Sequence, residues 1–137
     1  MIELQTAIFA RLNGDSVLQS LLGRTDGVVY GLQNVRAKAP CITFEEFGAT
    51  LGKVNTDNAQ TEDEGWQINI YANNAAEVVY RIRVLLDNYV FPASGNSGAV
   101  KMQFDVMLPT DTDQDLKVLM KTIRYRAYFA MQPVALI

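Results

Sequence analysis

The chain has 137 residues, of which 49% are hydrophobic and 20% charged, so it is long enough to bury one ordinary globular core. It contains no histidine and a single cysteine, which excludes Ser-His-Asp and Cys-His nucleophile pairs, the common zinc sites and an internal disulfide. The net charge of −3 argues against tight binding to duplex nucleic acid, which needs clustered Lys and Arg.

The N-terminal segment predicts two consecutive short helices. Residues 1–5 have neither the basic start nor the cleavage site of a secretory signal. Apolar residues then recur with a period near 3.6 over residues 3–12, which indicates an amphipathic helix. Asp15 is placed to cap a second apolar turn over residues 17–22, and Gly23 to end it. No apolar run here or later approaches the roughly 20 residues that cross a bilayer, so we expect no membrane partner.

The middle of the chain is expected to be rich in strands. Apolar runs and period-2 alternation predict strands over residues 28–31, 41–47, 66–71 and 100–106. Pro40 precedes the second of these, where proline is tolerated. Cys41 follows it, and without a histidine to activate the thiol we interpret Cys41 as a packed core residue. Residues 48–63 have little apolar content, which predicts a mobile loop.

The clearest helix is expected over residues 74–89. Its apolar residues follow the spacing of one buried helix face: Ala75, Val78, Val79, Ile82, Leu85, Leu86 and Tyr89. Asn74 and Glu77 resemble a capping box, with asparagine in place of the usual Ser or Thr. Glu77 and Arg81 stand at i and i+4 on the polar side, where they predict a weak stabilising pair.

A strand-like run over residues 117–131 carries apolar side chains on both of its faces. At ~3.3 Å per residue it would span more than ~40 Å, so it should bend, bulge or project beyond its own sheet. The two apolar faces indicate that a neighbouring subunit covers one of them. The candidate subunit or partner contacts lie in this run and in the apolar C-terminal tail: Ile123, Tyr125, Phe129, Leu136 and Ile137.

Two charged motifs resemble ligand sites without meeting their requirements. Residues 111–115 mimic the first half of an EF-hand loop, but Leu116 replaces the required glycine and Thr122 the bidentate glutamate. The basic residues of the C-terminal run interleave with aromatic ones, but strand alternation places its two lysines opposite its two arginines. Acid–base chemistry by carboxylates alone stays open, although no motif indicates it. We therefore expect no enzymatic activity, no cofactor and no metal.

Together these elements predict a single α+β domain over residues 1–137. Its largely antiparallel sheet of about four to five strands should have two helices packed on one face. The opposite face should carry polar or mixed residues: Thr43, Gln67, Asn69 and Gln103.

The order of these elements resembles the tail-completion, or tail-terminator, proteins of long-tailed (siphovirus-type) phages. The resemblance rests on the opening helical pattern over residues 7–23, the proline-led strand at residues 40–44 and the strand–helix unit over residues 66–89. It also includes the Asp-rich turn before the Arg-containing strand at residues 123–126. The chain departs from the family pattern after Gly31, where the approach to the proline is longer.

The resemblance implies a structural virion protein that caps the tail tube, ends its elongation and forms part of the head–tail joining interface. Related terminators act as rings, commonly hexameric, so the implied partners are further copies of the chain, the tail-tube protein and a head–tail connector or stopper protein. DNA would pass through the ring lumen without sequence-specific binding. The implied location is the virion tail or neck, and the host cytoplasm during assembly.

Two alternatives remain open from the sequence. One is a different neck or head–tail connector protein of the same virion. The other is a small bacterial ligand-binding or regulatory domain of the same α+β class. Co-purification with tail-tube protein favours a virion role, whereas a bound metabolite favours the regulatory domain.

Overall fold

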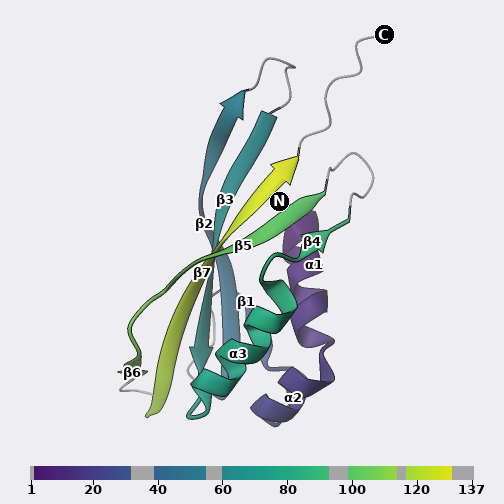
Figure 1. Cartoon of the computed structure of the whole chain (residues 1–137). Helices are drawn as coiled ribbons and strands as arrows, with labels where there is room; N and C mark the ends of the chain where they lie inside the picture. The colour runs from purple at the N-terminus through teal and green to yellow at the C-terminus, as the bar shows by residue number, and fades with distance from the viewer. Residues whose placement is uncertain (1, 32–38, 55–59, 93–98, 114–116, 131–137) are drawn as a thin grey trace.

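The structure, a computed structural model, describes residues 2–31, 39–54, 60–92, 99–113 and 117–130. Within these ranges three helices pack against one face of a curled sheet (Figure 1). The helices are α1 (Ile2–Asn13), α2 (Ser16–Leu22) and α3 (Ala75–Leu86). The expected α+β class is confirmed, with three helices in place of two.

The sheet has seven strands in the described ranges, in the order β1-β2-β3-β7-β5-β4, with β6 paired to β7. The strands are β1 (Val28–Tyr30), β2 (Cys41–Val54), β3 (Gln60–Tyr71), β4 (Val90–Phe91), β5 (Val100–Met107), β6 (Asp111–Asp113) and β7 (Val118–Ala130). β1 runs parallel to β2, and the other pairs are antiparallel. The sheet is therefore mixed, and its count exceeds the expected four to five because short strands are added at its margins.

The first two helices are joined by a well-formed cap. Asp15 has an extended backbone, and its Oδ2 accepts a hydrogen bond of 2.9 Å from the backbone N–H of Leu18. Gly23 ends α2 in the left-handed conformation with φ +69°, which glycine adopts without strain. Both assignments made from the sequence are confirmed.

α3 buries the predicted apolar stripe from Ala75 to Leu86, but the helix ends there, so Tyr89 lies outside it and is only partly buried. The polar contacts of α3 also differ from those expected. Asn74 makes no side-chain cap, and its Nδ2 instead donates to the backbone carbonyl of Leu21 at 2.9 Å. Arg81 bonds Asp15 and not Glu77. The expected capping box and the i,i+4 pair are therefore wrong, because the neighbouring helix α2 offers both side chains closer partners than α3 itself does.

The mobile loop expected over residues 48–63 is strand over residues 48–54 and 60–63, and residues 55–59 lie outside the described ranges. β2 and β3 continue their antiparallel pairing as far as Val54 and Gln60, with two irregularities in register. β7 lies along the other side of β3 and pairs with it from Thr61 to Tyr71. β7 is 13 residues long, so it also supplies hydrogen-bonding partners for the backbone of β3 at residues 61–63, whose side chains are not apolar. The paired strands extend beyond the helices (Figure 1).

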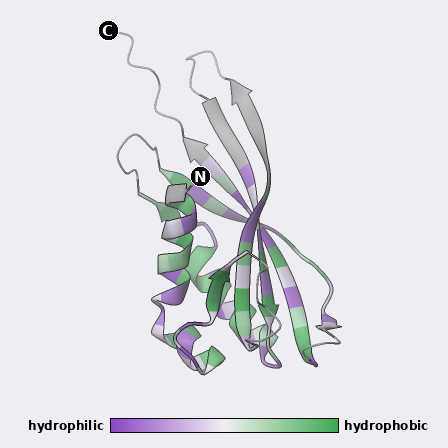
Figure 2. Cartoon of the chain, turned by 180° about the vertical axis from the view of Figure 1, so that it is seen from behind, coloured by the Kyte–Doolittle hydropathy of each residue, from purple (hydrophilic) through white to green (hydrophobic). Residues whose placement is uncertain are grey.

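The core lies between the three helices and the face of the sheet that they cover. Figure 2 shows hydrophobic residues recurring along the strands beside the helices. Trp66 and Phe44 meet there with ring centroids 6.0 Å apart, and Trp66 is fully buried. Ile82 enters from α3, also fully buried. Burial of one such aliphatic side chain stabilises the fold by roughly 1.5–3 kcal/mol.

Candidate assembly surface

The five residues predicted from the sequence as subunit contacts do not form one surface. Ile123 and Tyr125 are fully buried in the core of the single chain. The prediction that Ile123 and Tyr125 lie on a subunit surface is therefore wrong. Alternation along β7 turns both side chains towards the helices of their own chain. The side chain of Phe129 and residues Leu136 and Ile137 lie outside the described part of the structure, so their role stays a prediction.

A hydrogen-bonded cluster holds the C-terminal end of α3 on the sheet. The Tyr125 hydroxyl donates to Asp87 Oδ1 at 2.5 Å, and Arg83 Nε donates to Asp87 Oδ2 at 2.9 Å. Burial, together with this hydrogen bond, raises the pKa of Tyr125 well above its usual range. The Arg83 guanidinium also lies 3.9 Å from the centre of the Phe104 ring on β5. Asp87 thus fixes the end of α3 to β7, and Arg83, which Asp87 orients, contacts β5.

A second ion pair fixes α2 against α3. Arg81 donates from Nε to Asp15 Oδ2 at 2.8 Å and from Nη2 to Oδ1 at 2.6 Å, a two-pronged contact that also sets the direction of the guanidinium. The hydrogen bond from Arg81 lowers the pKa of Asp15, assisted by the Leu18 backbone N–H and opposed by partial burial. The outer surfaces of α2 and α3 are therefore held in a defined relative position.

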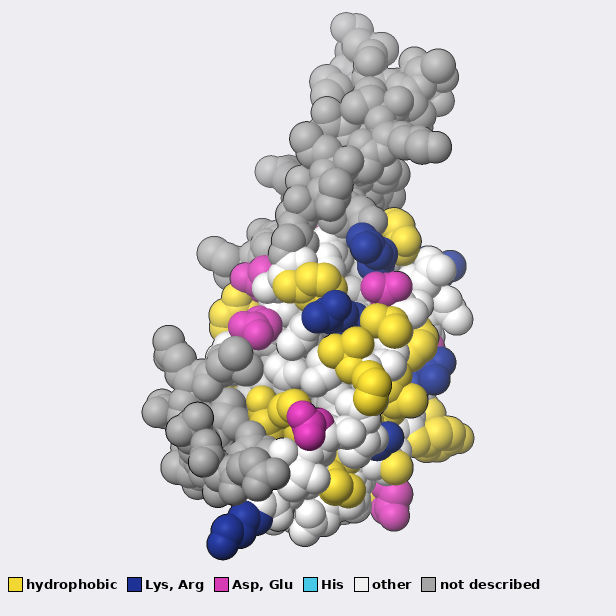
Figure 3. Space-filling model, turned by 90° about the vertical axis from the view of Figure 1, so that its left-hand side faces the viewer, with side chains coloured by type: hydrophobic (Ala, Val, Ile, Leu, Met, Phe, Trp, Pro, Cys, Tyr) yellow, Lys and Arg dark blue, Asp and Glu magenta, His cyan; other side chains and the backbone are white. Residues whose placement is uncertain are grey.

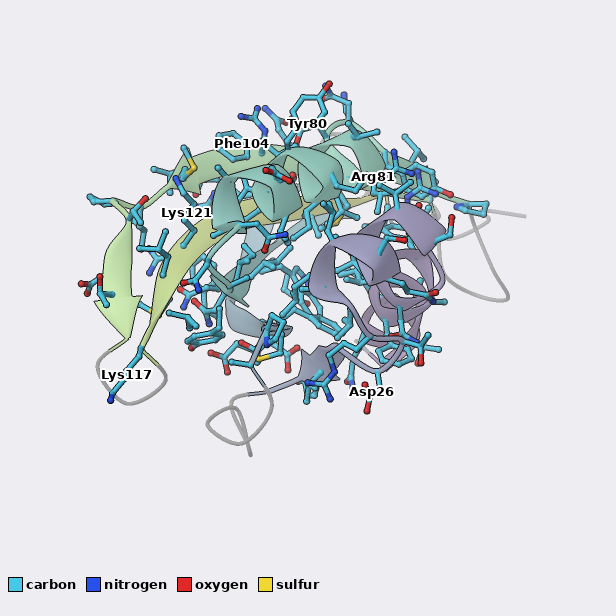
Figure 4. The ribbon with its side chains drawn as sticks, turned by 90° about the horizontal axis from the view of Figure 1, so that it is seen from below. Asp26, Tyr80, Arg81, Phe104, Lys117 and Lys121 are labelled. Atoms are coloured by element: carbon cyan, nitrogen blue, oxygen red, sulfur yellow. The ribbon has the colours of Figure 1, made fainter. Side chains whose placement is uncertain are left out.

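α3 carries a second apolar stripe on its outer side. Ala76, Tyr80 and Val84 stand four residues apart, and Tyr80 is 73% exposed and Val84 52% exposed. Tyr80 projects outward on the side of the molecule where Phe104 also lies (Figure 4). Val17 and Leu21 of α2 continue this surface across a hollow of about 450 Å³. We call these five residues the outer ridge.

The outer ridge is not predicted from the sequence, because the six-residue buried stripe dominates the periodicity of the same helix. Its own signal is present, since apolar residues at i, i+4 and i+8 share one line along a helix. A helix that is apolar on two sides of a single chain ordinarily has a second covering partner. The ridge is therefore a candidate contact surface.

The face of the sheet away from the helices is polar, as predicted. Thr43, Asn69 and Thr122 form a hydrogen-bonded row across three strands, with Asn69 donating to Thr43 Oγ1 at 3.4 Å and Thr122 donating to Asn69 Oδ1 at 2.8 Å. Beside them Arg124 Nε donates to Gln67 Oε1 at 3.0 Å. Figure 3 views this side, where acidic, basic and hydrophobic side chains are interspersed. No single-sign field is visible among the residues drawn there.

The basic residues of β7 are separated, as strand alternation predicts. Lys121 stands opposite Ile70 on the helix-covered face, whereas Arg124 and Arg126 stand opposite Gln67 and Gly65 on the polar face. Among the residues that the structure describes, no three His, Cys, Asp or Glu side chains gather where they could hold a metal. The acidic run beginning at residue 111 forms β6, and residues 114–116 lie outside the described ranges.

The fold that these elements define is an α+β unit with three helices on one face of a mixed, curled sheet. Neither a protein-family model nor a curated protein matches the chain. Among solved structures, a chain in the virion of a native gene transfer agent particle is similar, with a TM-score of 0.66 and 14% sequence identity. The similarity covers 93% of this chain and 94% of that chain. At this identity it establishes a shared fold. None of the described helices is long and apolar enough to span a bilayer.

Proposed function

We propose that this chain is a structural protein of a phage-like virion. The observation that carries the proposal is the extent of the similarity: the fold shared with a chain of a gene transfer agent virion spans 93% of this chain and 94% of that one. Nearly the whole of this chain is thus the same architectural unit as a component of an assembled particle. The exposed outer ridge supports a role in assembly, since it offers an apolar surface for a partner.

Within the virion, the role that fits best is that of the tail terminator. This finer assignment rests on the resemblance of the sequence to tail-completion proteins. In that role the chain forms a ring, taken here as a hexamer, on the last layer of the tail tube. It ends tube elongation and presents its other side to the head–tail connector, while DNA passes through the lumen. No catalytic step is required of it.

Deletion of the gene that encodes this chain, in the genome that produces the particle, tests this role. A terminator controls where the tube stops, so its loss should give tails of irregular, extended length that are not joined to heads. Loss of a connector protein should instead leave tails of normal length that fail to join. Electron microscopy of the particles, with restoration by the wild-type gene as the control, separates the two. Tails of normal length joined to heads would exclude both virion roles.

A binding assay provides an independent check. Purified protein should co-sediment with tail-tube protein in proportion to the number of tube ends and not to total tube length. Native mass spectrometry of the same preparation tests the regulatory-domain alternative. A small molecule retained in stoichiometric amount, together with no binding to tubes, would favour that alternative.

A further inference from the structure

The sheet ends in two edges that are each only partly covered. On one side β1 pairs with β2 only at Ile42–Phe44, and on the other β4 pairs with β5 only at Val100–Lys101. Met102 N–H still bonds the Tyr89 carbonyl at 2.9 Å. Beyond these points no strand in the described ranges lies on the outer side of β2 or of β5. Unpaired backbone groups at a strand edge are a template for another strand.

The two open stretches lie at overlapping heights on the sheet. Pairing can be followed across all four long strands in two nearby rows, with one row between them. One row contains Met107, Ile123, Ile68 and Phe44, and the other Phe104, Tyr125, Trp66 and Glu46. Residues 104–107 of β5, which pair with no described strand on their outer side, therefore lie level with Phe44–Glu46 of β2, where the pairing with β1 ends. A neighbouring copy needs little displacement along the strands to bring the two edges together.

The strand directions are also compatible. β2–β3, β3–β7 and β7–β5 are all antiparallel, so β2 and β5 of one chain run in opposite directions. In copies related by rotation about an axis along the strands, β2 of one copy is antiparallel to β5 of the next. Pairing across this junction continues the alternation that the sheet already has.

Both edges carry exposed apolar side chains. On the β5 side Val106 is 39% exposed and Met107 45% exposed. The outer ridge stands beside them, because Arg83 of α3 packs on the Phe104 ring of β5. On the β2 side Tyr30 of β1 is 37% exposed. Among the residues that the structure describes, each edge thus combines backbone that no further strand covers with apolar side chains beside it, as contacts between chains do.

The geometry points to a head-to-tail contact between two copies of this chain. The open edge of β2, from Glu45 onward, pairs antiparallel with β5 at residues 103–107 of the next copy and packs beside the outer ridge on α3. Because two different surfaces meet, the contact is heterologous and repeats until the rotation closes a ring. The inference rests on the proposed function only for its ring; the pairing of edges is argued from this sheet.

Single-cysteine variants test which edges meet. Glu45→Cys and Met107→Cys are prepared separately and treated with a short bismaleimide, alone and mixed. Wild-type protein, whose Cys41 is 1% exposed, controls for background. A covalent dimer should form in the mixture and not in either variant alone. A dimer from one variant alone, or no dimer in the mixture, overturns the proposal.

Charge substitution on the outer ridge gives a second readout. Tyr80→Glu and Val84→Glu should shift the assembled species towards monomer by at least tenfold in the concentration for half-assembly, as followed by light scattering. Phe9→Glu is the matched control, since Phe9 is an exposed apolar residue on α1, 39% exposed. Equal melting temperatures of the three variants would show that all fold. If all three variants assemble equally well, the ridge contact is overturned. Tail length, measured in particles that carry these variants, reports separately on the proposed function.

Discussion

Tyr125 and Asp87 are joined by a hydrogen bond of 2.5 Å. The bond connects the C-cap residue of α3, Asp87, to the middle of β7. The two residues are 38 positions apart in the chain, and the Tyr125 side chain is fully buried. Asp87 also pairs with Arg83, so its negative charge is balanced on the helix side. The position of the helix that carries Tyr80 and Val84 therefore depends on a polar contact inside the core.

Tyr125→Phe should destabilise the fold by roughly 1.5–3 kcal/mol, the range for a hydrogen bond to a charged group. The midpoint of urea unfolding measures this. Asp87→Asn is the matched variant, because it keeps an acceptor oxygen and should cost less. A double variant in which the two losses simply add would contradict a direct interaction between the pair.

The ion pair between Asp15 and Arg81 predicts a pH dependence. Partner contacts lower the pKa of Asp15 below its ordinary value of 3.8. A carboxyl whose pKa is lower in the folded state adds stability above the unfolded value and loses it as pH falls through the folded one. The stability difference between wild type and Asp15→Asn should therefore be present at neutral pH and shrink below about pH 4.

Asn at position 15 retains a capping side chain, so this variant removes the charge and not the helix cap. Asp26→Asn is the comparison, because Asp26 pairs with Arg24 at an exposed site where its side chain is 73% exposed. That variant should change stability little at any pH. A difference for Asp15→Asn that stays constant from pH 7 to pH 3 would contradict the proposed linkage.

Local features of this fold were predictable from the sequence, and features set by distant partners were not. The buried stripe of α3 and the Asp15 cap depend on residues within one or two helical turns, and both are present. The partner of Arg81 lies 66 residues away, and an i,i+4 rule therefore chose Glu77. Helix periodicity predicts which residues share a face of the helix. It does not predict which side chains of other elements form hydrogen bonds or ion pairs with those residues.

The same reason explains the strands. Residues 48–54 have the composition of a loop, yet they are strand because β3 lies beside them and is itself paired to β7. The sequence predicts a surface position for Tyr125 because β7 has apolar groups on two sides. Only the packing of the helices decides which of those sides is the core.

The acidic run at residues 111–115 leads to a prediction about metal binding. An EF-hand loop needs glycine after its fifth position and a bidentate glutamate at its twelfth, and this chain has Leu116 and Thr122 there. Thr122 is also buried, with its hydroxyl on Asn69. Calcium and a chelator should therefore leave the melting temperature unchanged within error. A reproducible rise of several degrees with calcium would contradict this, since a ligand that binds the native state stabilises it.

Gly65 and Phe47 predict a steric coupling on the polar face of the sheet. A Cβ atom at Gly65 would lie 2.7 Å from Cζ of the Phe47 ring, closer than carbon atoms normally approach. The Arg124 guanidinium lies over the same Phe47 ring, 4.8 Å from the ring centre. Gly65→Ala should therefore displace Phe47 and destabilise the protein by about 1 kcal/mol, as overpacking does.

The double variant Gly65→Ala, Phe47→Ala identifies the cause of that loss. With the ring removed, the added methyl group meets no obstacle, and alanine restricts the unfolded chain more than glycine does. Alanine at position 65 should then be neutral or stabilising relative to Phe47→Ala alone, as measured by urea unfolding. If Gly65→Ala costs the same in both backgrounds, the glycine is required by the backbone of β3 and not by the Phe47 ring.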